Sequence, residues 1–195
     1  MGKIYYMMGK SSSGKDTLFK LLKKAFPKFK EIVLYTTRPL REGETDGKEY
    51  HFVADEVLEE FQKAGKMIEL RAYDTMHGIW KYATVDDGQV DLQKTNYLSI
   101  GTLESYEKLQ EYYGADQIVP LYIEVEDGER LFRALSRERM QETPKYAEMC
   151  RRFLADTEDF SEDKLLRLGI QKKFINDDRD RCLNELTREI RNGNF

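Results

Sequence analysis

The sequence predicts an α/β protein in which a parallel sheet is flanked by helices, with an inserted lobe and a lid. Short apolar runs alternate with helical patterns along most of the 195 residues, which is typical of parallel sheets covered by helices. A glycine-rich loop follows the first apolar run. No linker rich in proline, glycine or serine divides the chain. We therefore expect one domain over residues 1–195.

Five apolar runs should form the strands, at residues 4–8, 32–35, 97–100, 119–125 and 173–175. Helices are expected between most of them. Asp55 is placed to cap a helix that Gly65 ends, and Thr102 to cap another that Gly114 ends. A short strand-like piece at residues 50–53 falls inside the inserted lobe.

Residues 9–17, GKSSSGKDT, lie between the first strand and a helix with an apolar face. Gly9 and Gly14 let the backbone curl so that N–H groups point at phosphate oxygens, and Lys15 adds a mobile positive charge. The dipole of the following helix supports the same anion. The spacing predicts a loop that binds the phosphates of a nucleotide, formed by Gly9, Lys10, Ser11, Ser12, Ser13, Gly14, Lys15, Asp16 and Thr17. Since Ser or Thr usually follows the lysine and binds Mg²⁺, Asp16 or Thr17 is the candidate metal ligand here.

The composition excludes several classes of protein. Thirty-two basic and 36 acidic residues give a net charge of −4, which argues against general binding to nucleic acid or acidic membranes. No apolar stretch reaches the length of a membrane span. Cys150 and Cys182 lack the neighbours of a disulfide framework or zinc site, so we expect free thiols in a reducing cytosol. We expect a cytoplasmic protein whose partners are small molecules, and its oligomeric state is left open.

A second anion site is indicated by Arg38 and Arg41, which flank Pro39 in a turn-rich stretch. Both guanidinium groups could converge on one doubly charged phosphate, with Tyr50 adding a hydroxyl. The alternative is a pair of ordinary surface arginines.

Glu69 has apolar neighbours, and a bare buried carboxylate is costly. It could pair with Arg71 or a lysine, or face solvent from a strand. Alternatively, one ionised carboxylate can accept both the N1–H and N2–H₂ donors of guanine, and Thr84 could offer a hydroxyl to O6 of the same base.

Together these residues resemble the guanylate kinase family, small P-loop enzymes that move the γ-phosphoryl group of ATP to GMP. The resemblance covers nearly the whole chain, through IYYMMGKSSSGKDTL, TTRPLREGE, DGKEYHFV, MIEL and FINDD. It implies phosphorylation of GMP and dGMP with ATP and Mg²⁺. It also implies a P-loop parallel sheet as the core, at residues 1–35 and 95–195, with a nucleotide-monophosphate-binding lobe at about 36–94 and a lid at about 136–146.

The resemblance assigns roles residue by residue. It places the GMP phosphate on Arg38, Arg41, Tyr50 and Tyr82, and guanine on Glu69 and Thr84. Arg137 resembles a lid arginine, Arg151 the arginine on the helix after the lid, and Asn176 a residue near the adenine of ATP. The implied catalytic residues are Lys15, Arg38, Arg137 and Arg151.

Three departures from the family pattern bear on the acceptor. Leu34 replaces a serine that usually helps to read guanine, residues 97–101 lack the usual two aspartates, and residues 74–81 replace a shorter turn. Ribose 1,5-bisphosphate phosphokinase resembles the chain in its Gly-Lys-Asp loop and its missing acidic pair, so a kinase of that kind is the alternative. A catalytically silent guanylate-kinase-like binding module is a further one.

The two histidines are not expected to be catalysts. His51 should be a half-exposed strand residue, and His77, in the unusual stretch, could approach the acceptor.

Overall fold

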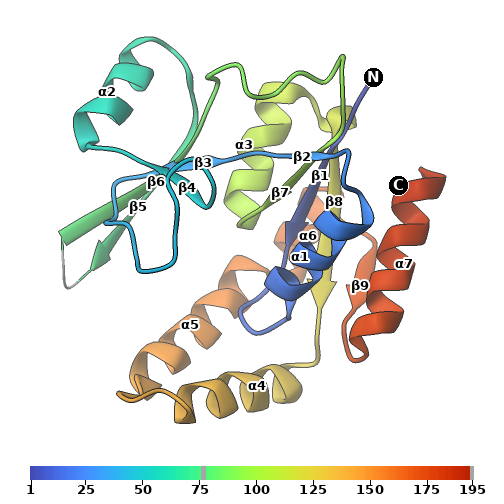
Figure 1. Cartoon of the computed structure of the whole chain (residues 1–195). Helices are drawn as coiled ribbons and strands as arrows, with labels where there is room; N and C mark the ends of the chain where they lie inside the picture. Colours follow the sequence, from blue (N-terminus) through green and yellow to red (C-terminus); the bar gives the residue numbers. More distant parts are fainter. Residues whose placement is uncertain (76–77, 194–195) are drawn as a thin grey trace.

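The computed structural model describes residues 1–75 and 78–193. Its central sheet confirms the parallel α/β fold (Figure 1). The strand order is β2-β7-β1-β8-β9, and each pairing is parallel. The strands are β1 (Ile4–Met8), β2 (Lys30–Glu31), β7 (Tyr97–Ile100), β8 (Ile118–Glu124) and β9 (Lys173–Ile175).

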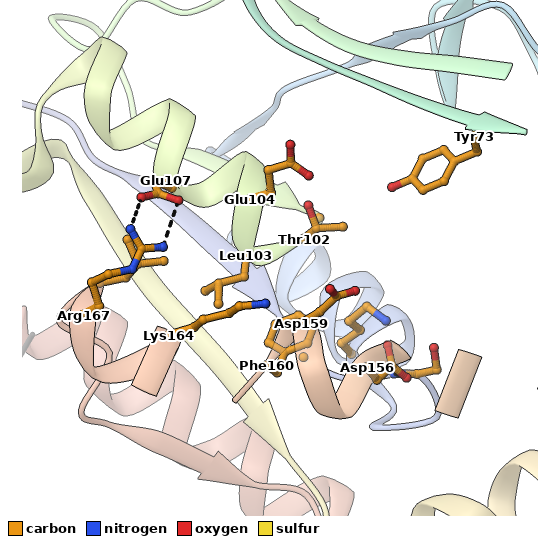
Figure 2. Close-up of a pocket in the computed structure, with 15 residues that line it drawn as sticks. Tyr73, Thr102, Leu103, Glu104, Glu107, Asp156, Asp159, Phe160, Lys164 and Arg167 are labelled. Carbon is orange, nitrogen blue, oxygen red and sulfur yellow. Dashed lines mark hydrogen bonds and ion pairs between the residues drawn. The ribbon is translucent and has the colours of Figure 1, made fainter. Parts of the chain in front are cut away.

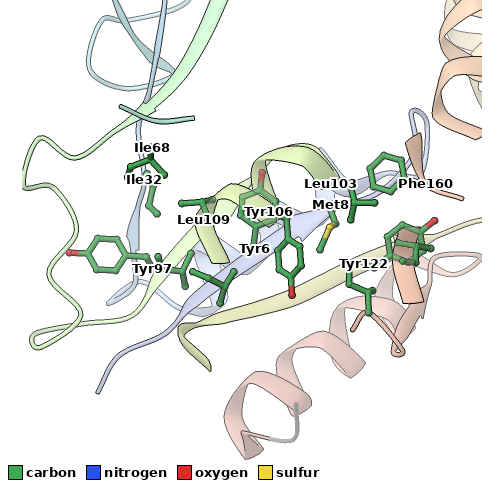
Figure 3. Packing of buried hydrophobic residues seen from close by; sticks show 14 residues of the cluster. Tyr6, Met8, Ile32, Ile68, Tyr97, Leu103, Tyr106, Leu109, Tyr122 and Phe160 are labelled. Carbon is green, nitrogen blue, oxygen red and sulfur yellow. The ribbon is translucent and has the colours of Figure 1, made fainter. Parts of the chain in front are cut away.

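Helices cover both faces of this sheet. On one face, Tyr6 and its alternate neighbours on β1 pack against apolar residues of α3 and α6 (Figure 3). On the other face, Met7 packs among residues of α1 and α7. Because both faces are buried, β1 is apolar throughout instead of alternating with polar residues. The helices are α1 (Lys15–Ala25), α2 (Asp55–Lys63), α3 (Leu103–Tyr113), α4 (Asp127–Arg139), α5 (Tyr146–Asp159), α6 (Glu162–Arg167) and α7 (Arg179–Asn192).

A second sheet, of order β4-β3-β6-β5, lies beside the first (Figure 1). Its long hairpin joins two antiparallel strands, and α2 covers a small core that includes Tyr35, Leu58 and Val85. This sheet lies within the region expected as an inserted lobe, although its first strand starts at Leu34. Its strands are β3 (Leu34–Thr36), β4 (Tyr50–Phe52), β5 (Met67–Thr75) and β6 (Gly78–Val85).

Two local predictions were wrong. The run at 32–35 is not one strand of the central sheet, because that sheet ends locally with β2 and the chain then crosses to the second sheet as β3. Asp55 does not cap α2. The preceding residue, Ala54, occupies the N-cap position, and the Asp55 carboxylate instead pairs with Lys81 Nζ at 2.6 Å.

The predicted helix cap at Thr102 and the strand predicted near residue 50 were confirmed. Thr102 caps α3 by accepting a hydrogen bond from the backbone N–H of Ser105, and the strand expected near residues 50–53 is β4. His51 is half-buried on β4, whereas His77 lies outside the described residues. Cys150 and Cys182 are both free thiols. Within the described chain, no helix is long and apolar enough to cross a membrane.

Candidate active site

The predicted phosphate-binding loop joins β1 to α1, as its sequence context indicated. Glycine is required at both ends of the loop, at Gly9 by a close approach of the backbone and at Gly14 by a positive φ. A Cβ on Gly9 would lie 2.4 Å from the backbone oxygen of Ile123, and Gly14 has a φ of 82°. Ser12 adopts a φ of 63°, which is uncommon for a residue other than glycine. The loop therefore has the curled backbone that a phosphate-binding loop needs.

Side chains from α4 and from the turn after β9, both distant in sequence, form hydrogen bonds with this loop. Asn176 Nδ2 donates to the backbone oxygen of Ser13 at 2.7 Å, and Arg137 Nη2 donates to Ser12 Oγ at 3.3 Å. The buried hydroxyl of Ser13 has no hydrogen-bond partner in the described structure, and such a group is a candidate for satisfaction by a ligand. Two predicted nucleotide-site residues, Arg137 and Asn176, are thus brought to the loop.

Helix α5 also reaches the loop, through residues that the sequence did not indicate. The backbone N–H of Ser11 donates to Asp156 Oδ2 at 2.8 Å, and Arg130 Nε of α4 donates to the backbone oxygen of Ser11 at 3.1 Å. The predicted Arg151 is exposed on α5, and its Nε donates at 2.7 Å to Glu148 on the same helix. The structure therefore does not bring Arg151 to the loop in the way it brings Arg137.

In the second sheet, Arg38 is almost completely buried, with 4% of its surface exposed. Its guanidinium forms two hydrogen bonds with Glu44, at 2.7 and 2.6 Å, and lies over the rings of Tyr50 and Phe52. The hydrogen bonds from Arg38 lower the pKa of Glu44 to about 2. Arg41 is exposed, and its backbone N–H donates to the same carboxylate. Arg38 is thus a buried cation that already holds one anion.

Glu69 and Thr84 face one another in the register of β5 and β6. The carboxylate of Glu69 accepts hydrogen bonds from Thr84 Oγ1 at 2.9 Å and from Arg71 Nε and Nη2 at 3.0 and 3.4 Å. Burial lowers the pKa of Arg71, but the charge of Glu69 opposes this and the pKa is raised overall. Tyr82, also on β6, packs its ring 5.7 Å from that of Tyr50. Of the stretch 74–81, residues 74–75 pair with residues 78–79 at the distal end of β5 and β6, away from the pairing of Glu69 with Thr84.

A cavity of about 600 Å³ connects the loop to the second sheet (Figure 2). Lys15 lines it from the loop, Thr102 and Glu104 from the start of α3, and Tyr73 from β5. Lys15 Nζ is 3.9 Å from Asp16, whose side chain is 79% exposed, so this lysine has no tightly bound anion there. Figure 2 shows Tyr73 across open space from Asp156 and Asp159, with Thr102 and Glu104 at one side of that space. The space can therefore admit a molecule that reaches from the loop to the second sheet.

Four residues of the site were missed or left undecided from the sequence. Arg71 was weighed only as one salt-bridge partner for Glu69. Glu44 gave a weak signal, because it lies three residues after Arg41 in a turn. Arg130 and Asp156 gave none, since their contacts with Ser11 join residues 119 and 145 positions apart.

Comparisons with known proteins, by family model, by sequence and by structure, all find guanylate kinases. A family model described as guanylate kinase matches residues 1–148. The guanylate kinase of Tropheryma whipplei (strain Twist) is 40% identical over 76 residues, covering 39% of this chain and 38% of that protein. The guanylate kinase of Nitratidesulfovibrio vulgaris is 38% identical over 86 residues, covering 44% and 42% respectively. The chain thus spans about two fifths of the length of these curated relatives.

A solved structure of guanylate kinase from Anaplasma phagocytophilum has the same fold, with a TM-score of 0.64. The superposition covers 98% of this chain and 86% of that one, at 19% sequence identity.

Proposed function

This chain belongs to the guanylate kinase family, and on that premise we propose that it transfers the γ-phosphoryl group of ATP to GMP or dGMP. The observation that carries the proposal is the cavity shared by Lys15 and Tyr73. A kinase needs donor and acceptor phosphates in line within one site, and this cavity joins the phosphate-binding loop to the second sheet.

ATP is proposed to bind with its phosphates in the loop at residues 9–17, and with its adenine near Asn176. Lys15 would neutralise charge on the β and γ phosphates, together with the N-terminal dipole of α1. Arg137 already contacts the loop, and closure of the predicted lid would add Arg151. No general base is needed, because the acceptor phosphate is itself an anionic nucleophile near neutral pH.

The GMP phosphate is proposed to take the place of the Glu44 carboxylate on Arg38, with Arg41, Tyr50 and Tyr82 around it. Both anions accept two parallel N–H bonds from one guanidinium, so the exchange keeps the buried cation paired.

Guanine is proposed to take the place of Arg71 on Glu69. The side chain of Arg71 presents two parallel donors to the two carboxylate oxygens, and the N1–H and N2–H₂ edge of guanine presents the same pattern. Thr84 already donates to Glu69 and remains its neighbour after the exchange.

Mg²⁺ usually keeps several waters and binds through one or two carboxylates together with substrate phosphates. Asp16 offers such a carboxylate and Thr17 a hydroxyl, and both are exposed in the first turn of α1 beside the loop. The ion would shield charge on the phosphates, while this chain supplies Lys15 and the loop N–H groups.

A kinase acting on ribose 1,5-bisphosphate is the second candidate. It is favoured by the ion pair between Glu69 and Arg71, because a carboxylate that already has a partner is less open to a base. The side chain of Leu34 packs against the central core and cannot read a base by hydrogen bonding, and the strand at residues 97–101 carries no carboxylate where the family commonly has two aspartates. A silent binding module is less consistent with Lys15, which has no use without a polyphosphate.

The test is a coupled ADP-release assay over a panel of acceptors: GMP, dGMP, AMP, CMP, UMP and ribose 1,5-bisphosphate. We expect GMP and dGMP to be at least about a hundredfold better than the other nucleotides in kcat/KM. A higher kcat/KM for ribose 1,5-bisphosphate would replace the first proposal by the second. Absence of ADP release with every acceptor would favour the binding module.

A further inference from the structure

Both backbone polar groups of Ser11 are held by charged side chains from other segments. Its N–H donates to Asp156 Oδ2 at 2.8 Å, and its C=O accepts from Arg130 Nε at 3.1 Å. Arg130 Nη2 also donates to Asp156 Oδ2 at 3.3 Å, so the contacts form a closed ring. We call these three residues the Ser11 clamp.

The clamp rests on a rigid support. Arg130 is 1% exposed, its guanidinium lies 4.6 Å from the centre of the Phe153 ring, and it also pairs with Asp127. A buried guanidinium keeps its partners, because leaving it unpaired is very unfavourable. The position of Arg130 is therefore fixed by packing and by charge, and it can fix Ser11 in turn.

The residue after the clamp is the strained one. Ser12 has a φ of 63°, a conformation that a residue other than glycine keeps only when its surroundings impose it. The clamp holds Ser11 on one side, and the hydrogen bond from Asn176 to Ser13 holds the other side. The curled loop is thus fixed at both neighbours of its strained residue.

We infer that Asp156 and Arg130 are positioning residues that hold the phosphate-binding loop in its nucleotide-binding conformation before ATP arrives. The inference rests on the proposed function for the identity of the nucleotide. The two residues come from α5 and α4, the helices on either side of the predicted lid, so the clamp also ties both of these helices to the loop. Their action is indirect, through the backbone of Ser11.

Removing the clamp should lower the population of the curled loop in the free protein. The apparent affinity for a nucleotide is the intrinsic affinity multiplied by the fraction of molecules in the competent conformation. Because release of one strained residue favours other loop conformations, we expect a loss of affinity of about tenfold. GMP is proposed to bind at the second sheet, away from the clamp, so its KM should change by less than about twofold.

The test uses the full chain with Asp156→Ala, Asp156→Asn and the control Glu158→Gln. Glu158 is an exposed acid two residues along the same helix. Three quantities are measured: the hydrogen-exchange rate of the Ser11 amide without ligand, the Kd for MgADP by calorimetry, and the KM values for ATP and GMP. For Asp156→Ala we expect amide exchange and Kd to rise by about tenfold or more. Asp156→Asn keeps one oxygen for the Ser11 N–H but loses the charge, so it should lie between, and Glu158→Gln should match the wild type.

Two results would overturn the inference. Wild-type amide exchange and MgADP affinity in Asp156→Ala would overturn it. An equal rise in the KM values for ATP and GMP would also overturn it, by showing general loosening of the fold. If Asp156→Ala does not fold, Asp156→Asn carries the same comparison. If the wild-type protein does not bind MgADP, the proposed function fails, while the exchange rate of the Ser11 amide still decides whether the clamp exists.

Discussion

Replacing Glu69 by glutamine tests the proposed base recognition most directly. The carboxylate accepts hydrogen bonds from Arg71 and Thr84 in the free protein, and the proposal exchanges the Arg71 donors for those of guanine. Glu69→Gln keeps the shape but replaces one oxygen by an NH₂ group that would face a donor of the base. Loss of one hydrogen bond and of charge assistance should cost about 2 to 4 kcal/mol, or about thirty- to a thousandfold in kcat/KM for GMP.

The same substitution weakens the buried pair with Arg71, so stability must be separated from recognition. Steady-state kinetics with GMP and with IMP, which lacks the 2-amino group, make this separation, because a loss of folded protein lowers both rates equally. We expect the wild type to prefer GMP by at least about tenfold, and Glu69→Gln to reduce that preference with little change in the KM for ATP. An unchanged GMP/IMP ratio together with an unchanged KM for GMP would show that Glu69 is structural.

The exchange on Glu69 has a second consequence, at Arg71. Arg71→Met removes the internal competitor and leaves the buried carboxylate with Thr84 alone. Breaking a buried pair in this way should lower the free energy of unfolding by about 3 to 5 kcal/mol. The KM for GMP should nevertheless fall, by about threefold or more, because guanine now supplies the missing partners.

The matched control for Arg71 is Lys81→Met on the neighbouring strand. Lys81 pairs with Asp55 at a partly exposed position, so neither the stability nor the KM should change much. A KM for GMP that rises in Arg71→Met would instead mean that Arg71 itself contacts the acceptor.

Two further predictions concern charged residues of the two proposed phosphate sites, Lys15 in the loop and Glu44 beside Arg38. Lys15→Ala should lower kcat by about a hundredfold or more with the fold intact, as judged by circular dichroism, and an unchanged kcat and KM for ATP would contradict the kinase proposal. The pKa of Glu44 is lowered to about 2 by the hydrogen bonds from Arg38, so the stability that this pair adds is complete above the unfolded pKa of about 4.5 and is lost as the pH falls through about 2. The difference in unfolding free energy between the wild type and Glu44→Gln should therefore be constant from pH 5 to 7 and should shrink below pH 4.5, whereas a difference that already shrinks between pH 7 and 5 would show that the pair does not lower this pKa.

The sequence was sufficient where local chemistry decides the structure. The loop at residues 9–17 combines glycines, a lysine and a following amphipathic helix, and the cap at Thr102 needs only a hydroxyl before an apolar stripe. The prediction of one central strand at 32–35 was wrong, because an apolar run alone does not indicate which of two sheets it joins. Asp55 fits the chemistry of either the cap or the first helical turn, and the neighbouring strand that carries Lys81 decides between them.

Several residues of the candidate site could be predicted from the sequence, but the partners of those residues could not. Arg38, Glu69 and Thr84 were identified by residue type, yet the partner of each depends on how the second sheet folds. Glu69 and Thr84 meet only because the β5–β6 hairpin sets their register across 15 positions. Asp156 could not be found at all, because its carboxylate meets Ser11 through the packing of α5 against the loop.

The two halves of the proposed site differ in what the free protein places on them. In the second sheet, Glu44 pairs with Arg38 and Arg71 pairs with Glu69, so each group proposed to bind the acceptor already has a charged partner in the free protein. At the loop, the one acidic partner of Lys15 among the described residues is Asp16, which is 3.9 Å away and exposed. ATP would therefore bind to a charge that is largely free, whereas GMP would have to exchange two existing pairs. Because an exchanged ion pair contributes only the difference between two interactions, the charge at Arg38 and Glu69 should add more to the choice of acceptor than to the strength of its binding.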